Sequence, residues 1–131
     1  MTFARPPMVG ADDRCFWDGV ADGRLLLQRC ADCDAIRHPP RPMCPACNSL
    51  RWDTFEATGR GTVHSYVISH PPVPPGFDDG YIVALIELEE GPRLVSSLTG
   101  VAPDAIRNDM AVEVVFEPIT EGVLMHRFRP A

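Results

Sequence analysis

The chain has 131 residues, 45% of them hydrophobic and 23% charged, which suits one small soluble domain or two very small ones. Its formal net charge is −6, and this acidic balance argues against nucleic acid as a partner, because nucleic-acid binders need a basic face. No run of about 18 apolar residues exists to span a membrane, and residues 1–10 lack the apolar stretch of a secretory signal, so we expect a cytoplasmic protein.

The first 23 residues are expected to form a loose arm followed by a short helix. Residues 1–12 are polar and rich in proline. Asp12 or Asp13 is placed to begin the helix, which passes through Phe16 and ends near residue 23. Cys15 lies within this helix beside an aromatic pair, and we expect it to be a small buried hydrophobe.

Residues 24–50 are expected to form a separate ribbon. A strand at residues 24–29 leads into two cysteine pairs. Prolines at positions 39, 40, 42 and 45 prevent a long helix, and few apolar residues are present to build a core. Such a segment needs another source of order, and a bound metal supplies one.

Residues 51–131 are expected to form a small β-barrel. Strands are predicted at 52–57, 62–69, 81–88, 93–99, 111–117 and 123–129, with one helical turn at 103–106. A sandwich needs about seven strands, so a closed barrel of the OB type fits better. The predicted fold class is therefore mainly β: a short N-terminal helix, a zinc ribbon and an OB-fold.

Four cysteines carry the clearest chemical signal. Cys30 and Cys33 enclose two residues, Cys44 and Cys47 enclose two more, and ten residues separate the pairs. Two such turns facing each other provide the four thiolates that tetrahedral zinc prefers. A site closed by four thiolates is structural and not catalytic. Iron is the alternative that the sequence leaves open, and His38, between the pairs, is expected at the surface or behind the ligands.

No other segment assembles a catalytic set. The sequence holds no recognisable nucleophile, base and oxyanion-hole motif, so we expect the chain alone not to be an enzyme. The proline-rich loop 70–80 is stiff and exposes apolar side chains without an evident core. It is either a plain surface loop or a contact with a partner or ligand, through His70, Val73 and Phe77.

Taken together, residues 16–118 resemble the DUF35 family, whose members combine a rubredoxin-like zinc ribbon with an OB-fold and associate with acyl-CoA enzymes. The resemblance is carried by short segments in a fixed order, which are Phe16-Trp17, Gly23-Arg24-Leu25, Arg29-Cys30-Ala-Asp-Cys33, Pro39-Pro40-Arg41, Cys44-Pro45-Ala-Cys47, Gly59-Arg60-Gly61-Thr62-Val63, Ser65-Tyr66, Tyr81-Ile-Val-Ala-Leu-Ile-Glu-Leu88, Gly91 and Met110-Ala-Val-Glu-Val-Val-Phe116. Three positions depart from the family: Asp34, Asn48 and Asp109 stand where glycine is usual. Asn48 adopts the left-handed conformation of a glycine more readily than Asp34 does.

The resemblance implies a function by association. Family members partner thiolase-fold enzymes, including lipid-transfer-protein-like aldolases and thiolases that act on acyl-CoA thioesters. Some are bound or fused to MaoC-like enoyl-CoA hydratases, notably in bacterial steroid side-chain degradation. The resemblance thus implies an accessory subunit that supports assembly and contributes to the CoA channel. The alternatives are a nucleic-acid-binding OB-fold and an iron-bearing redox protein.

Overall fold

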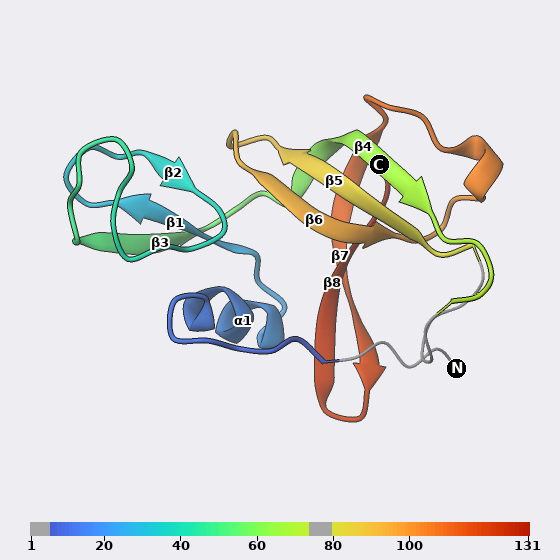
Figure 1. The fold of residues 1–131 in the computed structure, drawn as a ribbon, viewed down its shortest axis with the longest axis horizontal. Helices are drawn as coiled ribbons and strands as arrows, with labels where there is room; N and C mark the ends of the chain where they lie inside the picture. Colours follow the sequence, from blue (N-terminus) through green and yellow to red (C-terminus); the bar gives the residue numbers. More distant parts are fainter. Residues whose placement is uncertain (1–5, 74–79) are drawn as a thin grey trace.

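The computed structural model describes residues 6–73 and 80–131 of the chain. Its elements in chain order are α1 (Arg14–Ala21), β1 (Leu26–Cys30), β2 (Ile36–Arg37), β3 (Trp52–Glu56), β4 (Arg60–Ile68), β5 (Ile82–Leu88), β6 (Arg93–Leu98), the 3-10 turn η1 (Pro103–Ala105), β7 (Ala111–Thr120) and β8 (Val123–Pro130). The ribbon lies to one side, the barrel to the other, and α1 beside both (Figure 1). This arrangement confirms the predicted fold class.

The ribbon is a three-stranded antiparallel sheet in the order β2-β1-β3. Strand β1 pairs along its whole length with β3, from Leu26 opposite Glu56 to Cys30 opposite Trp52. The strand that begins at Trp52, which the sequence analysis grouped with the OB-fold, therefore lies in the sheet of the ribbon. A pattern of strand-forming residues indicates that a segment will pair, but it does not name the partner strand.

The second sheet is a closed barrel in the order β4-β5-β6-β8-β7, completed where β4 pairs with β7. Its ladders are antiparallel except the short parallel one between β6 and β8. At the closing point Gly61 pairs with Leu88 on one side and Val112 on the other. A Cβ on Gly61 would lie 2.5 Å from the carbonyl oxygen of Glu87, so this position requires glycine.

Helix α1 joins the ribbon and the barrel through one hydrophobic core. Phe16 and Val20 are buried in the same cluster as Leu27 of the ribbon and Phe128 of the barrel. Cys15, which we expected to be buried, is only half-buried on this helix. Neither α1 nor any other helix in residues 6–73 and 80–131 has the length and apolar character needed to cross a membrane.

Asp13 stands at the start of α1, as predicted, but it does not cap the helix with its side chain. One carboxylate oxygen accepts a hydrogen bond from the N–H of Gly10 at 2.7 Å, and the other accepts from Nε1 of Trp17 at 3.2 Å. Asp13 therefore fixes both the incoming chain and the indole ring of Trp17.

Candidate metal centre

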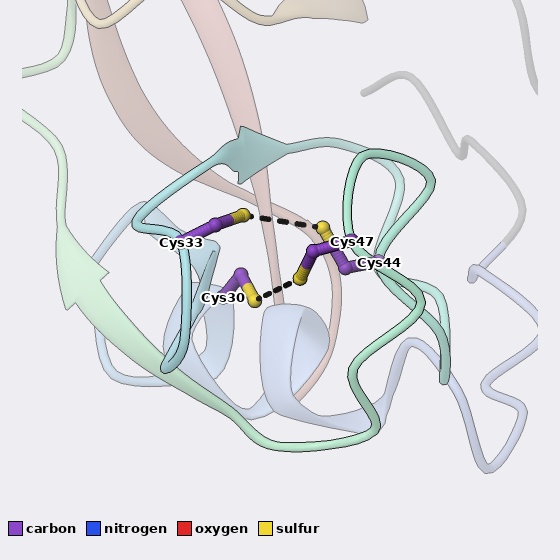
Figure 2. Close-up of side chains that lie close together, drawn as sticks. All are labelled: Cys30, Cys33, Cys44 and Cys47. Atoms are coloured by element: carbon purple, nitrogen blue, oxygen red, sulfur yellow. Dashed lines mark hydrogen bonds between the residues drawn. The ribbon is translucent and has the colours of Figure 1, made fainter.

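The side chains of four cysteines converge at one end of the ribbon (Figure 2). Cys30 is the last residue of β1 and Cys33 lies in the turn that follows it. Cys44 and Cys47 lie on the segment between β2 and β3. Their sulfur atoms all lie within 4.8 Å of one another. The Sγ atoms of Cys30 and Cys47 are 3.5 Å apart, and those of Cys33 and Cys44 are 3.6 Å apart.

The two cysteine turns are built alike. The N–H of Cys30 donates to the carbonyl of Ala35 at 2.9 Å, and the N–H of Cys44 donates to the carbonyl of Ser49 at 2.9 Å. The first cysteine of each pair, Cys30 or Cys44, is buried, whereas the second, Cys33 or Cys47, is exposed. Each turn therefore presents one sulfur from inside and one from the surface to a shared centre.

The sulfur atoms also receive hydrogen bonds from the backbone, which change the pKa of their thiols. The N–H of Cys33 lowers the pKa of Cys30 to about 6, because it stabilises the thiolate. The N–H of Cys47 lowers the pKa of Cys44 in the same way. The N–H of Ser49 lowers the pKa of Cys47, but the three neighbouring thiols and burial together raise it by more, to about 12. Four thiolates this close repel one another, and a cation removes that repulsion.

The geometry fits zinc. A tetrahedral ion with zinc–sulfur bonds of about 2.3 Å places its sulfur ligands about 3.8 Å apart. The sulfur–sulfur distances of 3.5 Å between Cys30 and Cys47 and 3.6 Å between Cys33 and Cys44 are close to that value and far from a disulfide bond length. Four cysteines would occupy every position of such an ion and leave none for water or substrate.

An ion-pair network ties the two cysteine turns together. Asp32, in the first turn, accepts hydrogen bonds from Ser49 and Arg51, which follow the second turn. These bonds lower the pKa of Asp32, Arg51 being the larger cause. The N–H of Ala31 also donates to the carbonyl of Arg51 at 3.0 Å. Nothing in the sequence pattern identified this network, because its members are 17 to 19 residues apart.

The other residues that the sequence analysis selected are dispersed. His38 is not among the clustered metal-ligating groups, and its ring packs on Phe16 with centroids 4.8 Å apart. His70 is exposed and Val73 is half-buried, at the end of the first described range. Phe77 lies outside the described residues. The contact role assigned to these three loop positions therefore stays a prediction.

Sequence reasoning missed a buried glutamine that supports the metal centre. Gln28, 1% exposed on β1, donates to the carbonyl of Arg41 at 2.9 Å and accepts from its N–H at 2.8 Å. Arg41 lies in the proline-rich segment between the cysteine pairs. Gln28 thereby fixes that segment to the sheet. The sequence did contain a signal for it, because Gln28 is a polar residue at an inward-facing position of a largely apolar strand.

Comparison with known proteins agrees with this architecture. Residues 17–53 match the family model described as the rubredoxin-like zinc ribbon domain of ChsH2, and residues 55–117 match its C-terminal OB-fold domain. A DUF35 domain-containing scaffold protein of Pyrococcus furiosus is 39% identical over 115 residues, which cover 82% of this chain and 83% of that protein. The chain belongs to the DUF35 family.

Two longer DUF35 relatives are named as hydratase subunits. A probable enoyl-CoA hydratase alpha subunit of Thermomonospora curvata is 44% identical over 95% of this chain. The 3-oxo-4,17-pregnadiene-20-carboxyl-CoA hydratase alpha subunit of Mycobacterium tuberculosis is 38% identical over 84% of it. The chain spans only 39% and 35% of the length of these two relatives.

One solved structure is similar over nearly its full length. A chain of an Ltp2–ChsH2(DUF35) aldolase superposes with a TM-score of 0.92 at 44% identity, covering 95% of this chain and 98% of that one. A DUF35 protein of Sulfolobus solfataricus superposes with a TM-score of 0.67 at 17% identity, a likeness of fold alone.

Proposed function

We propose that this DUF35 chain is a non-catalytic accessory subunit of a thiolase-fold acyl-CoA enzyme, an aldolase or thiolase, and that it supports assembly of that enzyme and its CoA channel. The observation that carries the proposal is the match to the DUF35 chain of an aldolase over 98% of that chain. An aldolase-type partner is favoured because the aldolase chain superposes on 95% of this chain with a TM-score of 0.92.

The proposal includes one structural zinc ion held by Cys30, Cys33, Cys44 and Cys47. The ion would cross-link two turns that also contact each other through exposed polar groups such as Asp32 and Arg51. Its binding energy would thus be folding energy for a segment with little core of its own. Zinc is favoured over iron because residues 17–53 match a family model described as a zinc ribbon, and four thiolates are a common ligand set of structural zinc.

Exposed apolar side chains on the ribbon support a role in binding another protein. Met43 is 49% exposed beside the second cysteine pair, Leu50 is 65% exposed, and Trp52 is 39% exposed opposite Cys30. These three side chains lie within ten residues of one another in the sequence, and contiguous apolar patches on a surface mark contacts with proteins, membranes or ligands. We also propose that the loop carrying His70 and Val73 contributes to the contact.

The described residues favour assigning the chemistry to the partner. Ser96 Oγ lies 2.7 Å from Nδ1 of His126, but both residues are buried and the hydroxyl also donates to the carbonyl of His126 at 3.2 Å. A serine whose proton is committed to a carbonyl, inside a barrel, is a structural group and not an activated nucleophile.

Reconstitution tests the proposal. The tagged chain is captured from its native host, acyl-CoA enzymes that co-purify are identified by mass spectrometry, and each is then expressed with and without this chain. The first substrates to try are CoA thioesters of steroid carboxylic acids, because one relative is named as a subunit of a pregnadiene-carboxyl-CoA hydratase. We expect a complex of fixed stoichiometry and a large gain in activity and solubility of the partner.

Two cysteine variants make the experiment specific. Cys44→Ser should abolish the complex, and Cys15→Ser, which removes a cysteine remote from the cluster in sequence, should retain it. A partner that is fully soluble and active without this chain would disprove the accessory role.

A further inference from the structure

A second site is formed where α1, the ribbon and the barrel meet. A cleft of about 400 Å³ opens there, within the range of about 300–1,000 Å³ typical of small-molecule pockets. It lies apart from the four cysteines, none of which lines it. Its walls are mainly aromatic and aliphatic. The residues that line it include Phe16, Trp17, His38, Leu85, Val95 and His126.

The hydrogen bonds of His126 determine what its ring offers to the cleft. The Ser96 hydroxyl has a single proton, which it donates to the carbonyl oxygen of His126 at 3.2 Å. With that hydroxyl proton on the carbonyl, the 2.7 Å contact between Ser96 Oγ and Nδ1 of His126 is satisfied by a ring proton on Nδ1. We assign this tautomer from the network. Nε2 is then a bare acceptor nitrogen on a ring that lines the cleft.

The ring of His126 is held rigidly in this orientation. Trp17 stacks against it at 5.7 Å with an interplanar angle of 19°, and Phe16 contacts its edge at 5.6 Å. His38 also lines the cleft and packs against Phe16, and its buried Nδ1 has no hydrogen-bond partner in the described residues. A buried polar nitrogen without a partner is uncommon and calls for an explanation such as a ligand or ordered water.

The two charged side chains that line the cleft both have partners within the protein. Asp13 at its edge is bonded to Gly10 and Trp17, and Arg93 is paired with Glu87 at 3.4 Å. Burial lowers the pKa of His126 to about 4, so its imidazole is neutral at physiological pH. Burial lowers the pKa of His38 to about 4 in the same way. Both imidazoles of the cleft are therefore neutral, and they match an uncharged ligand.

We propose that this cleft binds an uncharged ring compound that donates one hydrogen bond to Nε2 of His126. Aromatic or alicyclic alcohols and N–H heterocycles form the matching class, because their rings pack on Phe16 and Trp17 and their donor satisfies the bare nitrogen. The proposal does not depend on the accessory function proposed above.

A matched pair of probes tests the donor. Indole and benzofuran have nearly the same shape, but only indole carries an N–H. Binding to the full-length, zinc-loaded chain is followed by NMR of the imidazole nitrogens at pH 7. Indole should shift the Nε2 signal of His126 and bind about 2- to 12-fold more tightly than benzofuran, the value of one neutral hydrogen bond.

Two surface variants locate the binding. Val95 lines the cleft and is 62% exposed, so Val95→Trp should block the cleft without altering the core and reduce the affinity for indole at least tenfold. Val67 is 63% exposed on β4 and does not line the cleft, so Val67→Trp should leave the affinity unchanged.

Several outcomes would overturn the proposal. These are a protonated Nε2 in the free protein, no binding of either probe, equal affinity for both probes, or equal loss in the two tryptophan variants. A His126 signal that responds only to the partner enzyme would also overturn it, and would assign the cleft to a protein contact instead.

Discussion

Asp34 and Asn48 adopt the same left-handed backbone conformation, with φ = 64° in each, although their side chains differ. Each residue directly follows a cysteine pair, and the N–H of each donates to the carbonyl of the first cysteine of its pair, Cys30 or Cys44. The conformation costs a residue with a Cβ about 1–2 kcal/mol. The chain therefore forms both cysteine turns against a local backbone preference, which the contacts of the metal centre must offset.

Substitutions at Asp34 measure this cost. Asp34→Gly should leave the free energy of unfolding unchanged or raise it by up to about 1 kcal/mol, and Asp34→Val should lower it by about 1–2 kcal/mol. Asp22 is an exposed residue with φ = −94°, so the same changes there should show no such advantage of glycine over valine. Denaturant unfolding of the zinc-loaded protein makes the comparison. Equal effects of valine and glycine at position 34 would contradict the conformation.

The closing point of the barrel gives a second prediction. Gly61→Ala places a Cβ 2.5 Å from a backbone oxygen and 2.9 Å from Ile86, so β4 must shift away from β5. The expected loss of stability is about 1–3 kcal/mol. Gly10→Ala is the control, because a Cβ there makes only an ordinary contact at 3.4 Å. A Gly61→Ala protein as stable as the control would show that the barrel is not closed as described.

Local patterns accounted for much of this fold. The cysteine spacing identified the cluster. Apolar or β-branched segments between turn signals predicted the five barrel strands, because inward side chains such as Ile86 and Val112 must be apolar. The resemblance to the DUF35 family also pointed to the left-handed positions. Asp34, Asn48 and Asp109 stand where glycine is usual in that family, and φ is 64–65° at each.

Long-range relationships were not predictable in the same way. The pairing of β3 with the ribbon, the bonds from Gln28 to Arg41 and the contact between Ser96 and His126 each join residues 13 or more positions apart. Whether a buried polar residue finds a partner depends on the final packing and leaves no periodic trace in the sequence. His38 shows this: its environment is created by α1, a different part of the chain.

The buried glutamine gives a third prediction. Gln28→Leu keeps the size of the side chain but leaves the N–H of Arg41 without its acceptor. Arg37 still donates to the carbonyl of Arg41, so the expected cost is that of one unsatisfied group, about 1–3 kcal/mol. Denaturant unfolding measures it. A change below about 0.5 kcal/mol, typical of surface positions, would contradict the role assigned to Gln28.

His126 makes stability depend on pH. Its pKa is about 4 in the folded chain, mainly because of burial, against an ordinary value near 6.5. The unfolded chain therefore takes up a proton between these values when the folded chain does not. Stability is full above pH 6.5 and falls as the pH drops toward 4, by on the order of 3 kcal/mol from this group.

The variant His126→Gln isolates this effect. Its free energy of unfolding should fall less steeply than that of the wild type between pH 6.5 and 4.5, both measured at saturating zinc. His64 is exposed on β4, and His64→Gln should keep the wild-type slope. Identical slopes for wild type and His126→Gln would show that the imidazole is not buried in its neutral form.

The most direct measurement for the account is the metal content of the purified chain. The protein is expressed in medium that supplies both zinc and iron, and bound metals are quantified for wild type, Cys15→Ser and Cys44→Ser. We predict one zinc per chain in wild type and Cys15→Ser, and loss of the zinc together with unfolding of residues 30–50 in Cys44→Ser. Bound iron, no bound metal, or a Cys44→Ser protein that keeps its zinc and its ribbon would contradict the account.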